Sequence, residues 1–256
     1  MLALDWGEAL SAGSGTIGID GERDRLYART NGGAGSMPER FVTHEEARWI
    51  YDRIGGWQDT RPLSERRALD ALVERAAFER AGAVLEFGCG TGRLAARLLA
   101  ERLPAGARYH GFDVSPRMVE LARAAVAPWG DRARVDRVSG AVDLPVAAAS
   151  ADRLVSTYVL DLLSPADTRH FLTEAHRVLR PGGLLALASL TPGRAPAARA
   201  LTAAWRGVWR LDPALMGGCR PVELAALLDP EQWAARVHLT VTDVVLASEV
   251  VVAARR

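Results

Sequence analysis

Short apolar runs alternate with helical stretches from residue 83 onward, and this alternation constrains the fold more than any other feature of the sequence. The apolar run Ala83–Phe87 is followed by a helical stretch at 91–102, and Arg108–Asp113 is followed by one at 116–127. Strands joined by helices in this way form a parallel sheet with right-handed crossovers and helices on both faces. The other expected elements are strands at 133–138, 153–158, 184–190, 236–247 and 249–254 and helices at 165–179, 197–211 and 221–228.

The last two β-rich runs are joined by a short link, which is typical of an antiparallel hairpin. We therefore expect a Rossmann-like, doubly wound α/β fold with a sheet of seven strands, mostly parallel with the last strand antiparallel. Ser115 and Ser164 each precede a proline, and this pair of residues is a typical helix start. The segment Pro181–Gly183 is expected to end the helix at 165–179.

Residues 1–40 differ from the rest of the chain, because they contain eight glycines and no sustained helical or strand periodicity. Ordering such a segment would cost entropy with little apolar burial in return. We interpret 1–40 as a flexible leader and 41–256 as one domain. A capping-box pattern at Thr43–Glu46 predicts a helix that carries Tyr51, and a second helix is expected at about 64–80.

The charge balance and the cysteine content exclude several classes of protein. The 32 basic residues are all arginine and face 31 acidic residues, a net charge of +1. A nucleic-acid-binding protein normally has a strongly basic face, so nucleic acid is not an expected partner. With only Cys89 and Cys219 and no metal-ligand spacing, neither a disulfide framework nor a metal site is indicated. We expect a cytosolic protein, because no bilayer-length apolar run or export signal is visible.

A glycine-rich turn, Gly88–Gly92, follows the first expected strand and opens a helix, and Asp113 ends the second strand 21 positions after Gly92. Glycines let the backbone approach a ligand closely, and an acid at the second strand end accepts hydrogen bonds from ribose hydroxyls. A dinucleotide site would need glycine where Arg93 stands, which argues against a nucleotide-dependent oxidoreductase. The expected ligand is an adenosine compound without a pyrophosphate.

Three motifs in order give a resemblance to a known family. The segments Val84–Gly92, Gly111–Met118 and Glu174–Gly183 together resemble the class I S-adenosylmethionine-dependent methyltransferases, nearest the quinone-methylating type. The likeness extends from about Tyr51 to Leu190. It implies an enzyme that transfers a methyl group from S-adenosylmethionine.

The resemblance also implies roles for individual residues. Glu86 and the glycine turn would hold the methionine part of the cofactor, Asp113 the ribose, and Val114 and Met118 would flank adenine. The residues at the end of the fourth strand would line the reaction centre, and Tyr51 would contact the cofactor carboxylate. The implied cofactor-binding residues are Tyr51, Glu86, Gly88, Cys89, Gly90, Asp113, Val114, Met118, Gly140, Ala141 and Ser156, and those near the reaction centre are Ser156, Thr157 and Tyr158.

The sequence departs from the family pattern at one position. Relatives commonly have an aspartate that contacts the adenine amine where this chain has Gly140. Adenine would then be held by backbone groups and apolar contacts alone, or Asp143 would substitute for the missing acid from a shifted loop. A non-catalytic subunit or sensor that binds the cofactor is therefore a second hypothesis.

The expected acceptor is a small molecule, apolar or aromatic. Methyl transfer is an in-line displacement that depends chiefly on alignment of donor and acceptor, so the sequence need not contain a recognisable catalytic base. The amphipathic helix expected at 197–211 presents tryptophan and leucine on one face and arginines on the other. It could pack against the domain, form a lid over the acceptor within an insertion at 193–235, or contact a membrane surface.

Overall fold

The computed structural model describes residues 46, 63–140, 142–192, 202–205, 207–209, 219–242 and 247–256, all within the unit Phe41–Arg256. The expected leader at 1–40, Tyr51 and the capping box at its first three residues lie outside the described residues. None of the described helices is both long enough and apolar enough to cross a membrane.

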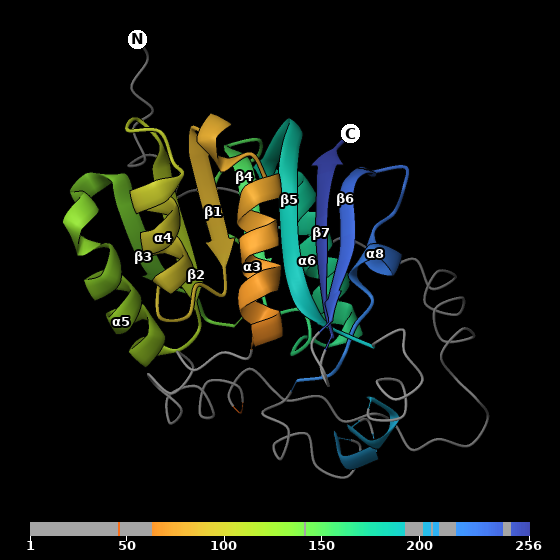
Figure 1. Cartoon of the computed structure of the whole chain (residues 1–256). Coiled ribbons are helices and arrows are strands. Elements are labelled where there is room, and N and C mark those ends of the chain that lie inside the picture. Colours follow the sequence, from red (N-terminus) through yellow and green to blue (C-terminus); the bar gives the residue numbers. More distant parts are fainter. Residues whose placement is uncertain are drawn as a thin grey trace. The chain divides into compact units, whose positions relative to one another are not determined.

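A seven-stranded sheet with the strand order β3-β2-β1-β4-β5-β7-β6 forms the centre of the unit (Figure 1). The pairs β1–β2, β2–β3, β1–β4 and β4–β5 are parallel, whereas β7 runs antiparallel to both β5 and β6. The expected Rossmann-like sheet with one antiparallel last strand is therefore confirmed. The strands are β1 Ala83–Phe87, β2 Arg108–Asp113, β3 Ala133–Arg137, β4 Ala151–Thr157, β5 Leu179–Thr191, β6 Trp233–Thr242 and β7 Ala247–Arg255.

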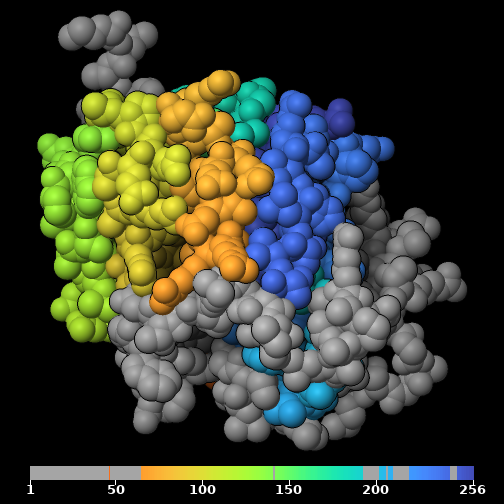
Figure 2. All heavy atoms as spheres, viewed as in Figure 1, coloured from red at the N-terminus to blue at the C-terminus, as the bar shows by residue number. Residues whose placement is uncertain are grey.

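Helices cover both faces of the sheet. In Figure 1 α3, α4 and α5 lie in front of the strands and α6 lies behind them. Figure 2 shows α3 exposed between α4 and the strand β6, and α3 packs on β6 and β7. The described helices are α3 Leu63–Arg75, α4 Arg93–Glu101, α5 Pro116–Val126, α6 Pro165–Val178 and α8 Leu224–Leu227, with 3-10 turns η2 Phe78–Arg80 and η3 Ala127–Arg132.

The core consists of two apolar layers, one on each face of the sheet. Val84 of β1 packs in the layer beneath α3, α4 and α5, and the next residue, Leu85, packs in the layer beneath α6. Successive side chains of a strand point to opposite faces. A strand buried on both faces therefore reads as a continuous apolar run, which is why β1 was visible in the sequence.

Two of the expected helix signals are confirmed and one is wrong. Ser115 and Ser164 cap α5 and α6, each accepting a hydrogen bond from a backbone N–H three residues later. In contrast, Pro181–Gly183 does not end a helix: α6 ends at Val178, and the three residues lie inside β5. The pairing with β4 shifts between Leu179 and Leu184, so the segment is a bulge with Gly182 at φ 75°.

Other boundaries also differ from expectation, and two of them matter here. The helix expected at 64–80 ends as α3 at Arg75, because Ala77 adopts the left-handed conformation at φ 49°. The strand expected at 236–247 begins earlier, at Trp233, so the last three residues of the proposed insertion 193–235 belong to the sheet.

Arg153 of β4 stabilises the end of α3. Its Nε donates to Ala76 O at 2.6 Å and its Nη2 to Ala77 O at 2.7 Å. We expect Arg153→Met to lower the free energy of unfolding by about 2–4 kcal/mol, because two carbonyls lose charged donors. Urea denaturation measures this change. The exposed Arg80→Met is the control, and equal stability of the two variants would contradict the assigned role.

Candidate functional site

A cavity of about 730 Å³ lies where the loops after β1, β2, β3 and β4 meet α3 and α4. These loops follow the carboxyl ends of parallel strands, where doubly wound folds bind ligands. Ten of the residues singled out in the sequence line this cavity: Glu86, Gly88, Cys89, Gly90, Asp113, Val114, Met118, Gly140, Thr157 and Tyr158. Tyr51 and Ala141 lie outside the described residues.

The glycine turn is held against β2 by its own backbone. Gly88 N and Cys89 N both donate to Phe112 O, at 2.8 and 3.0 Å. Gly88 has φ 72°, and a Cβ built on it would lie 2.3 Å from Cγ2 of Val159. The turn therefore needs glycine at position 88 for its conformation and for its closeness to the loop after β4.

Gly92 explains why the third glycine of the turn stands one place earlier than in a dinucleotide motif. It lies at the N-terminus of α4 with φ 77°, and a Cβ there would be 2.7 Å from the Cα of Ala122 in α5. This glycine therefore permits the close packing of α4 on α5. Its position does not require a pyrophosphate ligand.

Asp113 is fixed at the end of β2 by two backbone donors. Its Oδ2 accepts from Gly90 N at 2.8 Å and its Oδ1 accepts from Ser115 N at 2.9 Å. A carboxylate has about four lone-pair sites, so these two bonds do not fill it. The glycine turn and the acid at the second strand end form one unit, as the sequence indicated.

Glu86 lies beneath the glycine turn and is only 1% exposed. Its Oε2 accepts a hydrogen bond from Tyr109 Oη at 2.6 Å. Burial, together with the nearby Glu86 carboxylate, raises the pKa of Tyr109, so the phenol remains a donor. Sequence reasoning missed this pair. In the parallel pairing of β1 with β2, Glu86 lies opposite Gly111, and Tyr109 is two residues before Gly111 on β2.

Cys89 is a buried thiol in the centre of the turn. Burial raises its pKa well above the ordinary value, and the carboxylates of Asp113 and Glu86 raise it further. A thiolate is the nucleophilic form of cysteine. The side chain therefore stays neutral and serves as a small apolar residue of the turn.

The three residues expected at the reaction centre occupy different places. Ser156 has no exposed surface, is not among the cavity-lining residues, and donates to Phe87 O at 2.9 Å, which ties β4 to β1. Thr157 and Tyr158 line the cavity. Tyr158 has φ 57°, and its hydroxyl donates to Ser248 Oγ at 3.0 Å. A non-glycine residue with positive φ is strained, and such strain clusters at functional sites.

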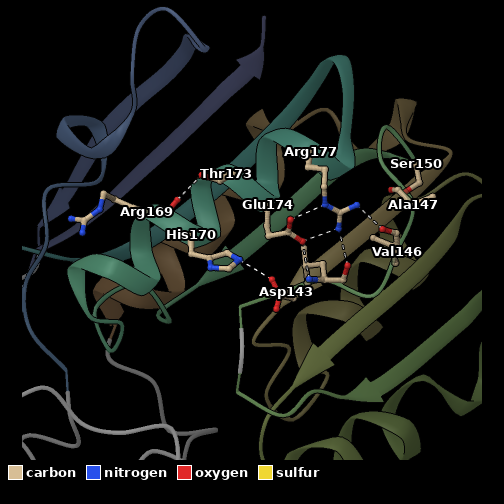
Figure 3. Close-up of polar contacts among 10 residues, drawn as sticks. Asp143, Val146, Ala147, Ser150, Arg169, His170, Thr173, Glu174 and Arg177 are labelled. Carbon is tan, nitrogen blue, oxygen red and sulfur yellow. Dashed lines mark hydrogen bonds and ion pairs between the residues drawn. The ribbon is translucent and has the colours of Figure 1, made fainter. Parts of the chain in front are cut away.

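The structure gives no support to the suggestion that Asp143 replaces the missing adenine-binding acid. Figure 3 shows the Asp143 carboxylate directed toward His170 of α6, and the distance from Oδ1 to Nε2 is 2.7 Å. Asp143 is not among the residues that line the cavity, whereas Gly140 is. The described residues therefore offer no side-chain carboxylate at the Gly140 position.

The third sequence motif fixes the loop after β3 to α6 (Figure 3). Arg177 donates to Glu174, to Val146 O and to Leu144 O, and Glu174 accepts from Leu144 N at 3.0 Å. Despite desolvation, these bonds hold the pKa of Glu174 below its ordinary value. Glu174 lies within 4.8 Å of potential metal ligands on Asp143 and His170, but its oxygens are already used in this network.

Asp161 is a cavity-lining residue that sequence reasoning missed. It follows β4 by four residues and has no exposed surface. Burial raises the pKa of its carboxyl from 3.8 to about 7. The available signal was an acid inside the apolar segment 159–163, directly after the strand whose end was expected to line the reaction centre.

Comparisons with known proteins give one family and several relatives. Residues 84–183 match the methyltransferase domain family. The chain is 36% identical over 143 residues to methyltransferase GfsG of Streptomyces halstedii, covering 53% of this chain and 49% of that protein. It is 39% identical over 107 residues to a malonyl-[acyl-carrier protein] O-methyltransferase of Hahella chejuensis, covering 42% of this chain and 36% of the relative. The chain thus spans half or less of the length of these two relatives.

A solved structure confirms the fold. The N-methyltransferase NodS of Bradyrhizobium japonicum, in complex with S-adenosyl-L-homocysteine, superimposes with a TM-score of 0.61 at 17% identity. The match covers 84% of this chain and 98% of that one. Neither the two relatives nor this structure is named as a quinone-methylating enzyme.

Proposed function

We propose that this chain, whose residues 84–183 match the methyltransferase domain family, transfers the methyl group of S-adenosylmethionine to a small-molecule acceptor. The observation that carries the proposal is the unit formed by the glycine turn and Asp113, joined by the 2.8 Å bond from Gly90 N to Oδ2. Two relatives named as methyltransferases and a neighbouring fold that holds S-adenosyl-L-homocysteine support the choice of donor.

The residues around the cavity suit this donor. The Glu86 carboxylate would pair with the ammonium group of its methionine part, and Asp113 would accept from the ribose hydroxyls. Val114 and Met118 offer apolar surface to adenine. With no acid at Gly140, the loss of one charge-assisted hydrogen bond would weaken binding by about 1.5–3 kcal/mol.

The chain's contribution to catalysis is alignment and the exclusion of water. The bound donor supplies an electrophilic methyl group, and holding an acceptor about 3 Å from it is worth roughly 7–11 kcal/mol. Tyr158 is fixed by its bond to Ser248, so its ring lies at a defined position in the cavity wall. An aromatic face there would favour a cationic centre.

The acceptor proposed here is a small apolar or aromatic molecule. Four leucines and one valine from three segments contribute to the cavity wall, namely Leu69, Val159, Leu162, Leu163 and Leu190. The finer assignment to the quinone-methylating type rests on the sequence motifs alone.

The insertion at 193–235 is proposed to cover the acceptor within the domain 41–256. Two contacts support this role. Trp205 Nε1 donates to Cys219 O at 2.9 Å, and Cys219 lines the cavity. Trp209 is buried, so this part of the segment packs against protein.

Isothermal titration with S-adenosylmethionine, S-adenosylhomocysteine and NAD tests the proposal. We expect binding of the first two and none of NAD. Incubation with labelled donor and a pool of cell metabolites then distinguishes an enzyme from a non-catalytic sensor. The absence of an acid at Gly140 is the observation that favours the sensor. A preference for NAD would end the proposal, and binding without transfer would support the sensor.

Asp113→Ala is expected to weaken S-adenosylhomocysteine binding at least about 10-fold, which corresponds to about 1.4 kcal/mol. The variant removes the ribose acceptor and the anchor of Gly90 N. The measurement is the dissociation constant by titration calorimetry, with the exposed Asp131→Ala as control. Unchanged affinity in a folded Asp113→Ala protein would refute this role.

A further inference from the structure

Asp161 is a buried acid whose carboxyl is not fully satisfied by the described side chains around it. It lies in the loop between β4 and α6, in the wall of the cavity, with 0% exposure. Neither Oδ1 nor Oδ2 has a hydrogen-bond partner in the part of the chain that the structure describes. Its backbone is anchored, because Asp161 O accepts from Arg220 N at 3.0 Å. The loop is therefore held in place while the carboxyl is left unsatisfied.

Other buried acids of the chain are different. Glu86 accepts from Tyr109, and Glu249 accepts from Leu224 N at 2.6 Å. Buried polar groups in folded proteins are nearly always hydrogen-bonded, so an exception calls for an explanation, and a catalytic role is one. A carboxyl that is only weakly held by the fold and lies in the cavity wall is suited to act on a bound molecule.

The charged and polar groups around Asp161 come from three elements. Burial raises its pKa most, Glu65 of α3 raises it further, and Arg220 and the Ser189 hydroxyl of β5 lower it in part. The resulting value of about 7 gives a mixture of acid and carboxylate near neutral pH. A general base is most effective when its pKa lies close to the working pH.

We infer that Asp161 is the general base of the proposed methyl transfer and that the acceptor is the hydroxyl of a phenol or enol. The inference rests on the proposed function. A lone pair of the acceptor oxygen forms the new carbon–oxygen bond while the methyl–sulfur bond breaks. The electron pair of the broken bond stays on sulfur, and the donor leaves as S-adenosylhomocysteine. The hydroxyl proton moves to a carboxylate oxygen of Asp161 and is later released to water.

The position of this acid also disfavours another class of acceptor. A carboxylate acceptor is already ionised and has no proton to give to a base. It would also have to share the cavity with the ionised form of Asp161 and with Glu65, and like charges at close range repel. A neutral hydroxyl, in contrast, would donate a hydrogen bond to the unsatisfied carboxylate.

Four other titratable groups of the cavity are engaged elsewhere or stay neutral. Asp113 is bonded to two backbone N–H groups and the Cys89 thiol stays neutral. Tyr158 donates to Ser248, and Asp167 accepts from the Ser164 hydroxyl at 2.7 Å. Among these, Asp161 is the group best placed to accept a proton.

Asp161→Asn tests the inference, since it keeps the shape of the side chain and removes the base. The enzyme is incubated with labelled S-adenosylmethionine and one acceptor at a time. The acceptors are hydroquinone, catechol, 2-naphthol, benzoate and a cell-metabolite extract. We expect an alkali-stable methyl ether as product. The variant should lower kcat at least about 100-fold. It should change the dissociation constant of S-adenosylhomocysteine less than about twofold. The fall of kcat at acid pH, which reports protonation of the base in the wild type, should be absent from the variant.

A readout independent of turnover is the infrared carbonyl band of the protonated carboxyl. It should titrate with a midpoint near pH 7 in the unliganded wild-type protein, be absent from Asp161→Asn, and persist in the matched control Asp131→Asn. An alkali-labile methyl ester, an undiminished kcat in Asp161→Asn, or transfer to no hydroxyl despite cofactor binding would overturn the inference. Failure of the wild type to bind S-adenosylmethionine would instead refute the proposed function.

Discussion

Alanine at position 88 is expected to weaken S-adenosylmethionine binding about 100-fold or more. Its Cβ would lie 2.3 Å from Val159 Cγ2, and the residue would have to keep φ 72°. The left-handed conformation costs a non-glycine residue about 1–2 kcal/mol, and overpacking adds typically 1–3 kcal/mol. The turn would relieve both by moving, which breaks the bonds from Gly88 N and Cys89 N to Phe112 O.

Two contributions to this effect can be separated. The double variant Gly88→Ala with Val159→Ala removes the overlapping methyl group, so we expect it to recover part of the affinity while the backbone strain remains. Gly130→Ala introduces strain at φ 53° with no atom within 4 Å of the new Cβ, and Gly106→Ala introduces neither. Both controls should leave binding within about twofold of wild type.

Titration calorimetry measures the affinity, and thermal unfolding shows whether the variant is folded. If Gly88→Ala binds within twofold of wild type, the turn is not the cofactor cradle. If the double variant binds no better than Gly88→Ala, the contact with Val159 is not the source of the loss.

The strands that sequence reasoning located best are buried on both faces and bounded by turn residues. The bounds of β1 and β2, at 83–87 and 108–113, are those expected. The errors arose where contacts distant in sequence determine the local structure. The break after Arg75 depends on Arg153, which binds the carbonyls of Ala76 and Ala77 across 76 or more positions.

The bulge in β5 illustrates a second kind of error. Proline followed by two glycines usually terminates a helix, and Pro181–Gly183 was interpreted in this way. The helix had already ended at Val178, because Leu179 adopts an extended conformation and pairs with Ala151 of β4. The local signal therefore lies close to the end of α6 but belongs to β5.

The candidate site divides in the same way. The glycine turn and Asp113 are short-range features of two adjacent strand ends, so spacing alone predicted that they meet. Tyr109 beneath Glu86 and the buried Asp161 in the cavity wall emerge only from packing. Asp143 was chosen for its nearness in sequence to Gly140, whereas the fold of α6 directs it to His170.

Asp161→Asn is expected to make the protein more stable at pH 8, although it removes the inferred catalytic base. The carboxyl has a pKa of about 7 when folded and 3.8 as its ordinary value, so between these values the unfolded chain binds fewer protons than the folded one. Stability of the wild type therefore falls as pH rises through this window. One pKa unit corresponds to about 1.4 kcal/mol.

The difference between variant and wild type should accordingly grow by about 2–3 kcal/mol between pH 5 and pH 8. Urea denaturation at these two pH values measures it, and Asp131→Asn, at an exposed site, should show no such growth. A constant difference at both pH values would mean that Asp161 titrates alike in the folded and unfolded chain, and its burial would then not explain its chemistry. If the difference in free energy of unfolding grows with pH, burial of the Asp161 carboxylate destabilises the fold. Such a loss of stability is common at sites whose chemistry needs a buried ionisable group.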